Sequence, residues 1–536
     1  MKAIDLYSGI GGWSLGLKMA GIEVIQSYEW WKPAATTLQK NLGGAVSQVD
    51  IRNLSLDELP IDVDLVVGSP PCTQFSYSNR GGSGDIEDGL RDISKFLEVV
   101  EHLRPKYWVM ENVPRVASIL RNELAPGGRL QRFNNLVEVI EVVDCASFGV
   151  PQRRRRMLAG KFPFEILASY TKLTPARTLS DIVGALANDP VIDPVYECAL
   201  PLFRVTDNEF EAPLNEEEAR LNREAKQYHP VYNVMPFPEP MGRPARTVTA
   251  TETRVSRESL IVLDPAEESC RRLTTRERAC LQSFPISYQL FGKSYSDRQK
   301  MIGNAIPPVL TYHIGHSILG TEPEALPPIS ESEYQHLLPD EIPGIAYQRT
   351  AAKVYPATRR FRAAIPHLRF GSGFRFDLSN DCIGGEFSWR VRFYFGASKD
   401  YRCIEPNDDI LDMARSALTN KGPFDAAMDL LDTRLGYIGH CDLKGIQDVW
   451  THRSRTGLGP FAIVDALGNC VPEIAAILLP DQTANIYPFI ADLVNSSSLN
   501  GTFSHQTSKQ KIRKICLPVF TGLLISAWFN RITKVP

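Results

Sequence analysis

The sequence predicts an α/β protein with a doubly wound, mostly parallel sheet, a small irregular domain after it, and a separate α+β region at the end. Three observations lead to this fold class. Short apolar segments alternate with helix-like segments through residues 1–161, and such alternation builds βαβ units. The alternation is lost in 162–245. A stretch with five prolines and six acidic residues at 321–345 then precedes a region of different character.

The elements of the first part follow in a regular order. Its strand-like segments are KAIDLYS, EVIQSYEW, a shorter one that ends at Asp50, VDLVVGSP and YWVMENV. The helix-like segments between them are GWSLGLKMAG, PAATTLQKNL and DISKFLEVVEHLRP. Strands separated by helices of this length pair in parallel, because the chain must cross over a face of the sheet to return.

Composition limits the class of protein. A chain of 536 residues is too long for one ordinary domain, and its formal charge of −3 argues neither for nor against nucleic acid. Its ten cysteines form no CxxC pair and no zinc-like cluster with histidine, so we expect reduced thiols and no metal site. The run CLPVFTGLLISAWF is too short to span a bilayer, and the first residues leave no room for a signal peptide. We therefore expect a cytoplasmic protein without membrane contact.

Polar and glycine residues mark three successive strand ends. The stretch DLYSGIGG brings Gly9, Gly11 and Gly12 to the turn between the first strand and its helix, where the backbone can approach a ligand closely. Glu29 ends the second strand and Asp50 the third. Carboxylates at these places suit a ribose and an adenine amino group. Taken singly, each acid could equally be a surface cap or an ion-pair partner.

A cysteine follows the fourth strand directly. Pro70 and Pro71 stiffen the loop in GSPPC, so the Cys72 thiol is held near the expected switch point of the sheet, where ligands bind. Glu111 ends the fifth strand, and a carboxylic acid near a thiolate could hydrogen-bond or protonate a substrate ring. A small buried hydrophobe is the ordinary interpretation of a single cysteine. The loop position favours a nucleophile.

Four arginines, 153–156, precede a further strand-like segment. A charge run is usually a solvated face or a targeting signal. Because this run lies between FGVPQ and the strand-like MLAG, we expect its arginines to face a phosphate or a base.

Six motifs occur in order along residues 1–320: DLYSGIGG, GSPPCTQFS, ENVP, FGVPQRRRRM, RPARTVT and GNAIPP. This ordered set resembles that of the DNA (cytosine-5) methyltransferases of bacterial restriction–modification systems. The resemblance implies a Rossmann-like methyltransferase fold, S-adenosyl-L-methionine as cofactor and double-stranded DNA as substrate. Cytosine would be methylated at C5 after it is flipped out of the duplex.

The same resemblance assigns roles to residues of this chain. Cofactor binding falls to residues at the strand ends and in the last motif: Tyr7, Gly9, Gly11, Gly12, Glu29, Asp50 and Asn304. Glu29 would bind the ribose and Asp50 the adenine. Asn304 would close the methionine end, so we expect a helix over 301–318 that packs against the N-terminal strands.

The catalytic residues implied by the resemblance are Cys72, Glu111, Arg154 and Arg156. Cys72 would attack C6 of cytosine while Glu111 holds N3. Gln152, Arg154 and Arg156 match a Q-x-R-x-R pattern that would support the flipped nucleotide and the catalytic loop. Gln152 is in addition expected to contact DNA.

The segment after Cys72 is polar and glycine-rich. We expect it to form a mobile loop that closes over the flipped base, with Ser76 in contact with DNA. A disordered surface loop is the alternative.

Five segments are expected: a catalytic and cofactor-binding part at 1–161, a target-recognition domain at 162–245, the closing part of the catalytic domain at 246–320, an extended linker at 321–345, and a C-terminal domain at 346–536. The start of the last segment, 346–376, carries seven lysines and arginines, no acid, and interleaved aromatic residues. That mixture suits nucleic-acid binding, although a solvated basic face is the simpler interpretation.

Several alternatives stay open. PNDD (406–409) and CDLK (441–444) loosely match the pattern of metal-dependent endonucleases, so the chain could be a methyltransferase fused to a restriction endonuclease. An RNA cytosine-5 methyltransferase would carry a Cys-Phe-Thr signature in the target region, which is absent from the sequence. A non-catalytic DNA-binding paralogue would lack Cys72 or Glu111. We expect a monomer in the nucleoid-associated cytoplasm, serving a restriction–modification or defence system with a cognate restriction endonuclease.

Overall fold

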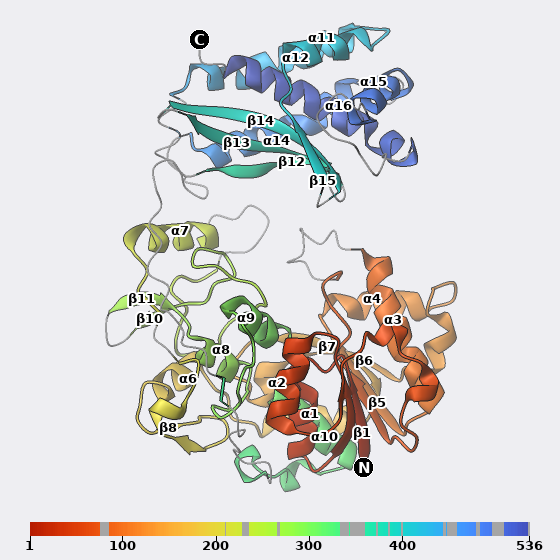
Figure 1. Ribbon diagram of the computed structural model, residues 1–536, viewed down its shortest axis with the longest axis vertical. Coiled ribbons are helices and arrows are strands. Elements are labelled where there is room, and N and C mark those ends of the chain that lie inside the picture. Colours follow the sequence, from red (N-terminus) through yellow and green to blue (C-terminus); the bar gives the residue numbers. More distant parts are fainter. Residues whose placement is uncertain are drawn as a thin grey trace. The chain divides into compact units, whose positions relative to one another are not determined.

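The structure of the protein is a computed structural model (Figure 1). It describes residues 1–75, 85–208, 211–227, 235–264, 268–332, 342–343, 360–370, 374–383, 386–397, 400–442, 446, 458–478, 483–495 and 509–533. Contacts divide the chain into two compact units, of which unit 1 holds Met1–Asn222 and Met235–Lys353 and unit 2 holds Arg223–Val234 and Val354–Pro536.

Unit 1 is built on a seven-stranded sheet with the order β3-β2-β1-β4-β5-β7-β6. Its strands are β1 (Lys2–Leu6), β2 (Glu23–Tyr28), β3 (Val46–Ser47), β4 (Leu65–Gly68), β5 (Tyr107–Asn112), β6 (Val139–Asp144) and β7 (Arg155–Lys161). The first five pair in parallel, and β7 runs antiparallel to both β5 and β6. The predicted doubly wound, mostly parallel sheet is therefore confirmed.

Helices cover both faces of this sheet (Figure 1). Their bounds are α1 (Gly12–Met19), α2 (Lys32–Leu42), α3 (Ile86–Leu103), α4 (Arg115–Leu124) and α5 (Phe164–Ser169). Alternate residues of the central strands enter two different cores, as Ala3 and Leu65 join the core beneath α1 while Ile4 and Val66 join the core beneath α3 and α4. Burial of both strand faces explains why the strands read as continuous apolar runs.

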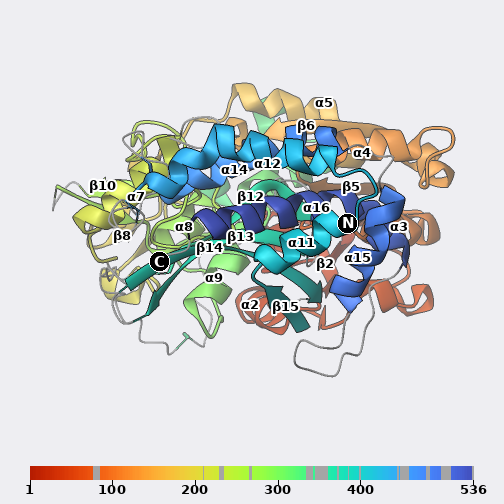
Figure 2. The same cartoon turned by 90° about the horizontal axis from the view of Figure 1, so that it is seen from above.

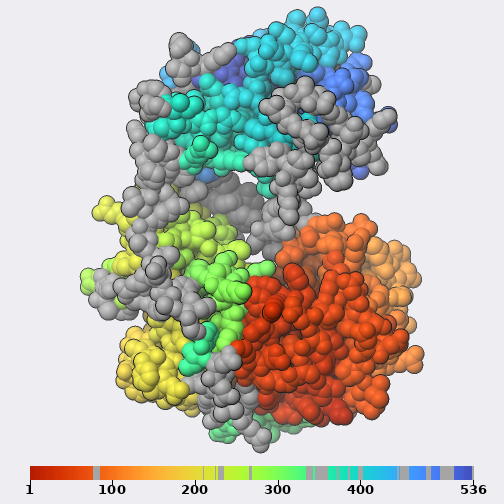
Figure 3. All heavy atoms as spheres, in the orientation of Figure 1, coloured from red at the N-terminus to blue at the C-terminus, as the bar shows by residue number. Residues whose placement is uncertain are grey.

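The region after β7 has short, irregular elements. They are α6 (Leu179–Ala185), β8 (Val191–Ile192), β9 (Ala199–Leu200), α7 (Glu216–Gln227), β10 (Ile261–Asp264), β11 (Ser269–Arg272) and α8 (Thr275–Leu281). Figure 3 shows these yellow and green residues gathered beside the red and orange part of unit 1. Buried ion pairs tie them together: Arg271 bonds Asp264 at 2.6 Å and Glu277 at 2.8 Å.

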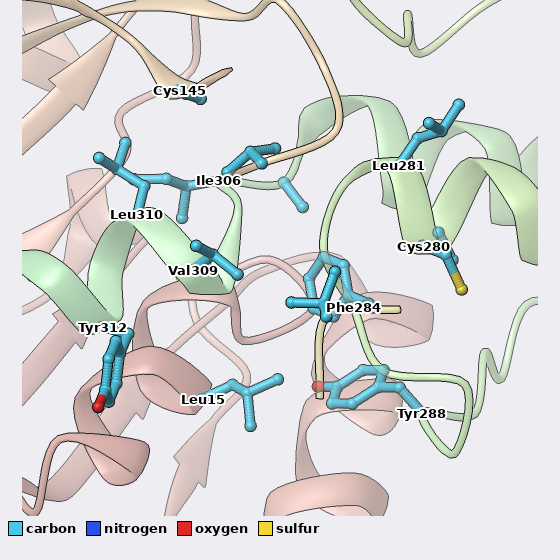
Figure 4. Packing of buried hydrophobic residues seen from close by; sticks show 14 of the residues in the cluster. Leu15, Cys145, Cys280, Leu281, Phe284, Tyr288, Ile306, Val309, Leu310 and Tyr312 are labelled. Carbon is cyan, nitrogen blue, oxygen red and sulfur yellow. The ribbon is translucent and has the colours of Figure 1, made fainter. Parts of the chain in front are cut away.

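The last motif forms two helices, α9 (Tyr295–Asn304) and α10 (Pro308–Leu319), so the expected single helix over 301–318 is wrong. Pro307 and Pro308 explain the break, since proline lacks an N–H and forces the preceding residue out of the helical conformation. α10 packs against α1, where Thr311 Oγ1 donates to Gly12 O at 2.7 Å, and it shares one core with Ala3 of β1 and Leu65 of β4. Figure 4 shows Val309 and Leu310 of α10 in the same core as Leu15 of α1.

The stretch expected as an extended linker, 321–345, is bound to unit 1 over its first part. Tyr312 Oη donates to Pro327 O at 2.8 Å, and Leu326 and Ile329 pack against the core of unit 1. The stretch forms two short 3-10 helices, Pro323–Ala325 and Ile329–Glu331, in place of an extended solvated chain, because two apolar side chains and a buried phenol hold it against unit 1. Most of 333–345 lies outside the described residues.

Unit 2 is an α+β structure, as predicted. Its antiparallel sheet follows the order β12 (Arg362–Phe370), β13 (Phe374–Ile383), β14 (Glu386–Ala397) and β15 (Asp400–Ile404). Its larger helices are α11 (Asp408–Ser416), α12 (Gly422–Leu435), α14 (Pro460–Leu478), α15 (Thr483–Asn495) and α16 (Lys509–Ile532). Figures 1 and 2 show these helices on one face of the sheet.

The apolar run near the C-terminus belongs to α16, a helix of 24 residues. The expectation that this segment is too short for a membrane is therefore wrong: by length and composition alone, α14 and α16 could each cross one. Most of α16 is buried in the core of unit 2, against β14, α14 and α15. Its place in that core accounts for its apolar composition, since a fully buried helix is hydrophobic on all sides.

Gly16 in α1 tests the contact between α1 and α10. A methyl group there would overlap Thr311 Oγ1 and the backbone of Pro308, whereas one at Gly184 in α6 would meet nothing. Gly16→Ala should destabilise unit 1 by about 1–3 kcal/mol through overpacking, and Gly184→Ala should stabilise it by about 0.5–1 kcal/mol. Differential scanning calorimetry would measure both, and equal thermal stability of the two variants would contradict the close approach.

Candidate active site

The first part of the predicted cofactor site is the glycine turn after β1, beside which lies the carboxylate of Glu29. Gly9 and Gly11 adopt positive φ angles of 54° and 86°, a conformation that glycine adopts without strain. The buried Glu29 carboxylate accepts the Gly9 N–H at 2.8 Å and the Trp31 N–H at 2.7 Å. Burial raises the pKa of Glu29, while these backbone donors lower it. Glu29 is thus held firmly at the end of β2, beside the turn.

Tyr7 and Trp30 flank this turn. Tyr7 is a non-glycine residue with φ of 56°, and its hydroxyl lies 3.3 Å from the Asp92 carboxylate. Strained backbone of this kind at a strand end is typical of binding sites. Trp30 was not predicted as a site residue, although it follows Glu29 directly. Its indole is 62% exposed, and a flat apolar ring at this position suits a purine.

Asp50 lies just beyond β3 rather than within the third strand. The Asp50 carboxylate accepts the N–H of Arg52 at 3.1 Å and so caps the short helix Ile51–Asn53. The cap suggested by the sequence is therefore present, and the Asp50 side chain is exposed.

The last motif closes over the glycine turn. A Cβ at Gly12 would overlap Ile306 O, so only glycine permits this approach. Asn304 is exposed at the end of α9, and the carbonyls on either side of it, Gly303 O and Ala305 O, accept from Arg154 Nη2 at 2.8 and 3.0 Å. The glycine turn, Glu29, the exposed indole and Asn304 together fit an adenosyl cofactor with a charged amino-acid end.

The loop that carries Cys72 is anchored at several points. Ser69 N donates to Leu6 O at 3.2 Å, and Trp13 Nε1 donates to Ser69 Oγ at 3.0 Å. Asn112 Nδ2 donates to Pro70 O at 3.0 Å. Trp13 and Asn112 are positioning residues that the sequence did not reveal. Asn112 stands next to Glu111 at a strand end, which is the one signal that could have indicated its role.

The structure brings Cys72, Glu111, Arg154 and Arg156 into one electrostatic cluster. Arg156 Nε lies 2.7 Å from Glu111 Oε1, and both side chains are almost fully buried. Burial is the largest influence on the pKa of the Cys72 thiol and raises it. Arg156 and Arg154 lower that pKa, and Glu111 raises it. The thiol is therefore neutral at rest, with two guanidinium groups near enough to stabilise its anion.

The side chains of Gln152 and Arg154 hydrogen-bond to distant segments inside the protein. The Gln152 side chain is fully buried: its Nε2 donates to Leu281 O at 3.1 Å and Gln282 Oε1 at 2.6 Å, and its Oε1 accepts from Val248 N at 2.7 Å. The expected contact between Gln152 and DNA does not fit this geometry, because no surface remains for it. The partners lie about a hundred residues away, so no local signal could have shown them.

Arg154 is equally buried. Besides its two bonds in the last motif, it donates from Nη1 to Val248 O at 3.1 Å. Burial, and then the neighbouring Arg156, lower the pKa of Arg154 to about 9. The four arginines alternate, with Arg153 and Arg155 exposed and the other two buried, so the run is not one solvated face.

One buried carboxyl beneath the glycine turn escaped prediction. Asp5 Oδ2 accepts from Ser14 Oγ at 2.6 Å, and burial raises the pKa of Asp5 to about 7. An acid in the middle of an apolar strand gives a weak sequence signal, because its partner Ser14 is on the next helix.

Two further expectations concern other residues. Ser76, expected to contact DNA, lies outside the described residues. Within the described part of the chain no group of three His, Cys, Asp or Glu side chains could hold a metal ion. The acids of PNDD form the first turn of α11, where Asn407 accepts the N–H of Ile410, and Lys444 of CDLK is not described. The nuclease alternative therefore gains no support from the described residues.

Comparison with known proteins identifies the class. Residues 1–320 match the family model of the C-5 cytosine-specific DNA methylases. The chain belongs to this family, as the ordered motifs predicted. It is therefore a DNA (cytosine-5) methyltransferase that uses S-adenosyl-L-methionine.

The relatives are enzymes of restriction–modification systems. The type II methyltransferase M.HindV of Haemophilus influenzae is 28% identical over 61% of this chain and 99% of its own length. M1.HphI of Haemophilus parahaemolyticus is 28% identical over 59% of this chain and 86% of its length. The structure of the S. pombe Dnmt2 methyltransferase is 17% identical, covers 60% of this chain and 98% of its own, and gives a TM-score of 0.44.

Arg154→Ala should weaken both the fold of unit 1 and cofactor binding. It removes a donor from three backbone carbonyls, of which Ala305 O keeps Gln282 Nε2 as a partner, and this loss costs about 3–5 kcal/mol for a buried charged group. Affinity for S-adenosylhomocysteine, measured by calorimetry, should fall at least about tenfold because the segment around Asn304 loses its anchor. The exposed neighbour Arg153→Ala is the control. Unchanged affinity in Arg154→Ala would contradict the bracing role.

Glu111→Gln should make Cys72 more reactive while it removes a catalytic carboxyl. Glu111 raises the pKa of the thiol, so its neutralisation lowers that pKa and increases the thiolate fraction at about pH 8. Alkylation of Cys72 by iodoacetamide, followed by peptide mass spectrometry, should become several-fold faster. The exposed Glu141→Gln on β6 should leave the rate unchanged. A slower reaction in Glu111→Gln would contradict the electrostatic coupling.

Proposed function

We propose that the chain methylates C5 of a cytosine at a specific site in double-stranded DNA through a covalent bond between Cys72 Sγ and C6 of the base. One observation carries this proposal: Cys72 lies on an anchored loop beside the Glu111–Arg156 ion pair. Such an arrangement combines a positioned nucleophile, a group for N3 of the ring and a cation that stabilises the thiolate.

The proposed chemistry needs a thiolate, and the cluster explains how one forms. Cys72 loses its proton on the way to the adduct, and Arg156 and Arg154 stabilise the resulting negative charge. The thiol proton passes to solvent as the sulfur bonds to C6, and the displaced ring electrons are taken up at N3 by a proton delivered through Glu111. This makes C5 nucleophilic. Loss of the C5 proton after methylation restores the C5–C6 double bond and expels the Cys72 thiolate.

The cofactor is proposed to lie along the ends of β1, β2 and β3. When bound, S-adenosyl-L-methionine supplies an electrophilic methyl group. Glu29 would accept hydrogen bonds from the ribose hydroxyls, and Asp50 from the adenine amino group. Tyr7 and Trp30 would contact the purine. Asn304, held between two carbonyls that Arg154 anchors, would close the methionine end over the glycine turn.

The target base is proposed to leave the duplex before reaction. Sulfur cannot reach C6 of a stacked cytosine, so the base must be flipped out, at a cost of a few kcal/mol. We assign site recognition to 162–245, between the catalytic parts 1–161 and 246–320. The closing role of the segment around Ser76 remains part of this proposal.

The biological setting follows from the relatives. Membership of a DNA methylase family favours DNA over RNA, and the presence of both Cys72 and Glu111 favours an enzyme over a DNA-binding paralogue. Because the curated relatives are type II methyltransferases, we propose a cognate restriction endonuclease as partner. All assigned catalytic groups come from unit 1 of one chain, which supports action as a monomer. We place the enzyme in the nucleoid-associated cytoplasm because its proposed substrate is double-stranded DNA.

Cys72→Ser should reduce methyl transfer to DNA by at least about 10³-fold, since a serine hydroxyl is a far weaker nucleophile than a thiolate. The test is transfer of label from S-adenosylmethionine to DNA, with bisulfite sequencing to place the methyl group. Cys145→Ala is the matched control, because Cys145 is fully buried and lies within the influence of the same arginines and Glu111. Full activity of Cys72→Ser, or methylation of adenine or of cytosine N4, would contradict the mechanism.

A further inference from the structure

One face of the sheet in unit 2 is apolar and the other is charged. Phe376, Val391 and Phe393 point to the side of the helices and belong to the core. Because strand residues alternate, their neighbours point to the opposite face, which none of the helices named above for unit 2 covers (Figures 1 and 2). We call this opposite face the polar sheet face. Its charged residues are Arg362, Arg369, Arg375, Asp377, Asp381, Arg390, Arg392 and Glu405.

Positive charge gathers at one end of the polar sheet face. Arg369 on β12 pairs directly with Arg375 on β13, a like-charge pair that destabilises a sheet unless an anion is near. Arg362 lies over the ring of Tyr394, with its Cζ 3.9 Å from the ring centroid, and the Cζ of Arg375 is 5.3 Å from the same centroid. These three residues, Arg362, Arg369 and Arg375, are the arginine cluster.

Among the described residues, Asp377 is the acid that bonds to the arginine cluster. Asp377 Oδ2 accepts from Arg362 Nε at 2.6 Å and from Arg375 Nε at 2.9 Å. The Asp377 side chain is 4% exposed, whereas those of Arg362 and Arg375 are 40% and 36% exposed. The negative charge is therefore buried while the positive charge reaches the surface, and three guanidinium groups present an excess of cationic charge.

The other end of the face is neutralised. Arg392 pairs with Asp381 and, at 3.2 Å, with Glu405, and Arg390 also lies 3.2 Å from Glu405. The excess positive charge thus belongs to the arginine cluster and not to the sheet in general.

We propose that the arginine cluster binds the phosphate backbone of double-stranded DNA and gives the chain a second DNA-binding surface in unit 2. Guanidinium groups match phosphate oxygens with paired hydrogen bonds. Among the described residues, the ring beneath the arginine cluster favours the duplex over the single-stranded mode, because that mode uses exposed rings for base stacking. Tyr394 is buried beneath Arg362 and offers no such ring.

This surface has a role beyond the methylation reaction. Phosphate contacts bind DNA without regard to sequence. Two DNA-binding surfaces on one chain raise the effective concentration of duplex at each of them. Unit 2 would therefore retain the enzyme on DNA while unit 1 meets successive sites.

The test uses the full chain and a duplex of about 20 A·T base pairs, whose binding depends on phosphate contacts. Because this probe holds no cytosine, the result does not depend on the proposed methylation. The double variant Arg369→Gln/Arg375→Gln should bind it about tenfold more weakly at moderate salt, and the slope of log affinity against log salt should fall by about 2. Arg369→Gln alone should lower the slope by about 1.

Two controls separate this effect from folding and net charge. Arg415→Gln/Arg434→Gln removes the same charge from two exposed ion pairs on the helices of unit 2 and should bind like the unaltered protein. Arg369→Lys/Arg375→Lys keeps the charge and should retain most of the salt slope. An unchanged slope in the glutamine variant, an equal loss in the control, or a loss confined to single-stranded DNA or RNA would each overturn the proposal.

Discussion

The active half of this protein depends on a buried guanidinium group that bonds to backbone carbonyls from two distant segments. Arg154 stands at the start of β7, yet its donors reach Val248, Gly303 and Ala305. Charge-assisted bonds are strong in a dry interior, and a buried charge without such partners would be very costly. The start of β7, the segment around Val248 and the last motif are therefore held in one geometry, since displacement of any one of them breaks hydrogen bonds of Arg154.

β7 also contains Arg156, which lies in the cluster around Cys72. β7 is the neighbour of β5 in the sheet, and Arg156 forms an ion pair with Glu111 of β5. Burial alone would keep the Cys72 thiol protonated and inert, and the two arginines oppose that effect. The site is thus poised rather than permanently activated, which suits a nucleophile that should react only with a base placed against it.

Unit 2 uses charge in a different way. In unit 1 several ion pairs are internal, as in the Arg271 network with Asp264 and Glu277. On the polar sheet face of unit 2 the acid is buried and the arginines are exposed. The two units therefore differ in which partner of an ion pair is exposed to solvent. Composition alone does not show this difference, because the chain as a whole is slightly acidic.

The sequence by itself determined the sheet, the order of motifs, and the placement of Cys72, Glu29 and Glu111 at or beside strand ends, because strand rhythm, glycine turns and prolines act over a few residues. Only the tertiary structure decided that Gln152 and Arg154 face inward. That outcome depends on contacts across about a hundred residues or more, where burial and hydrogen-bond satisfaction override the local pattern.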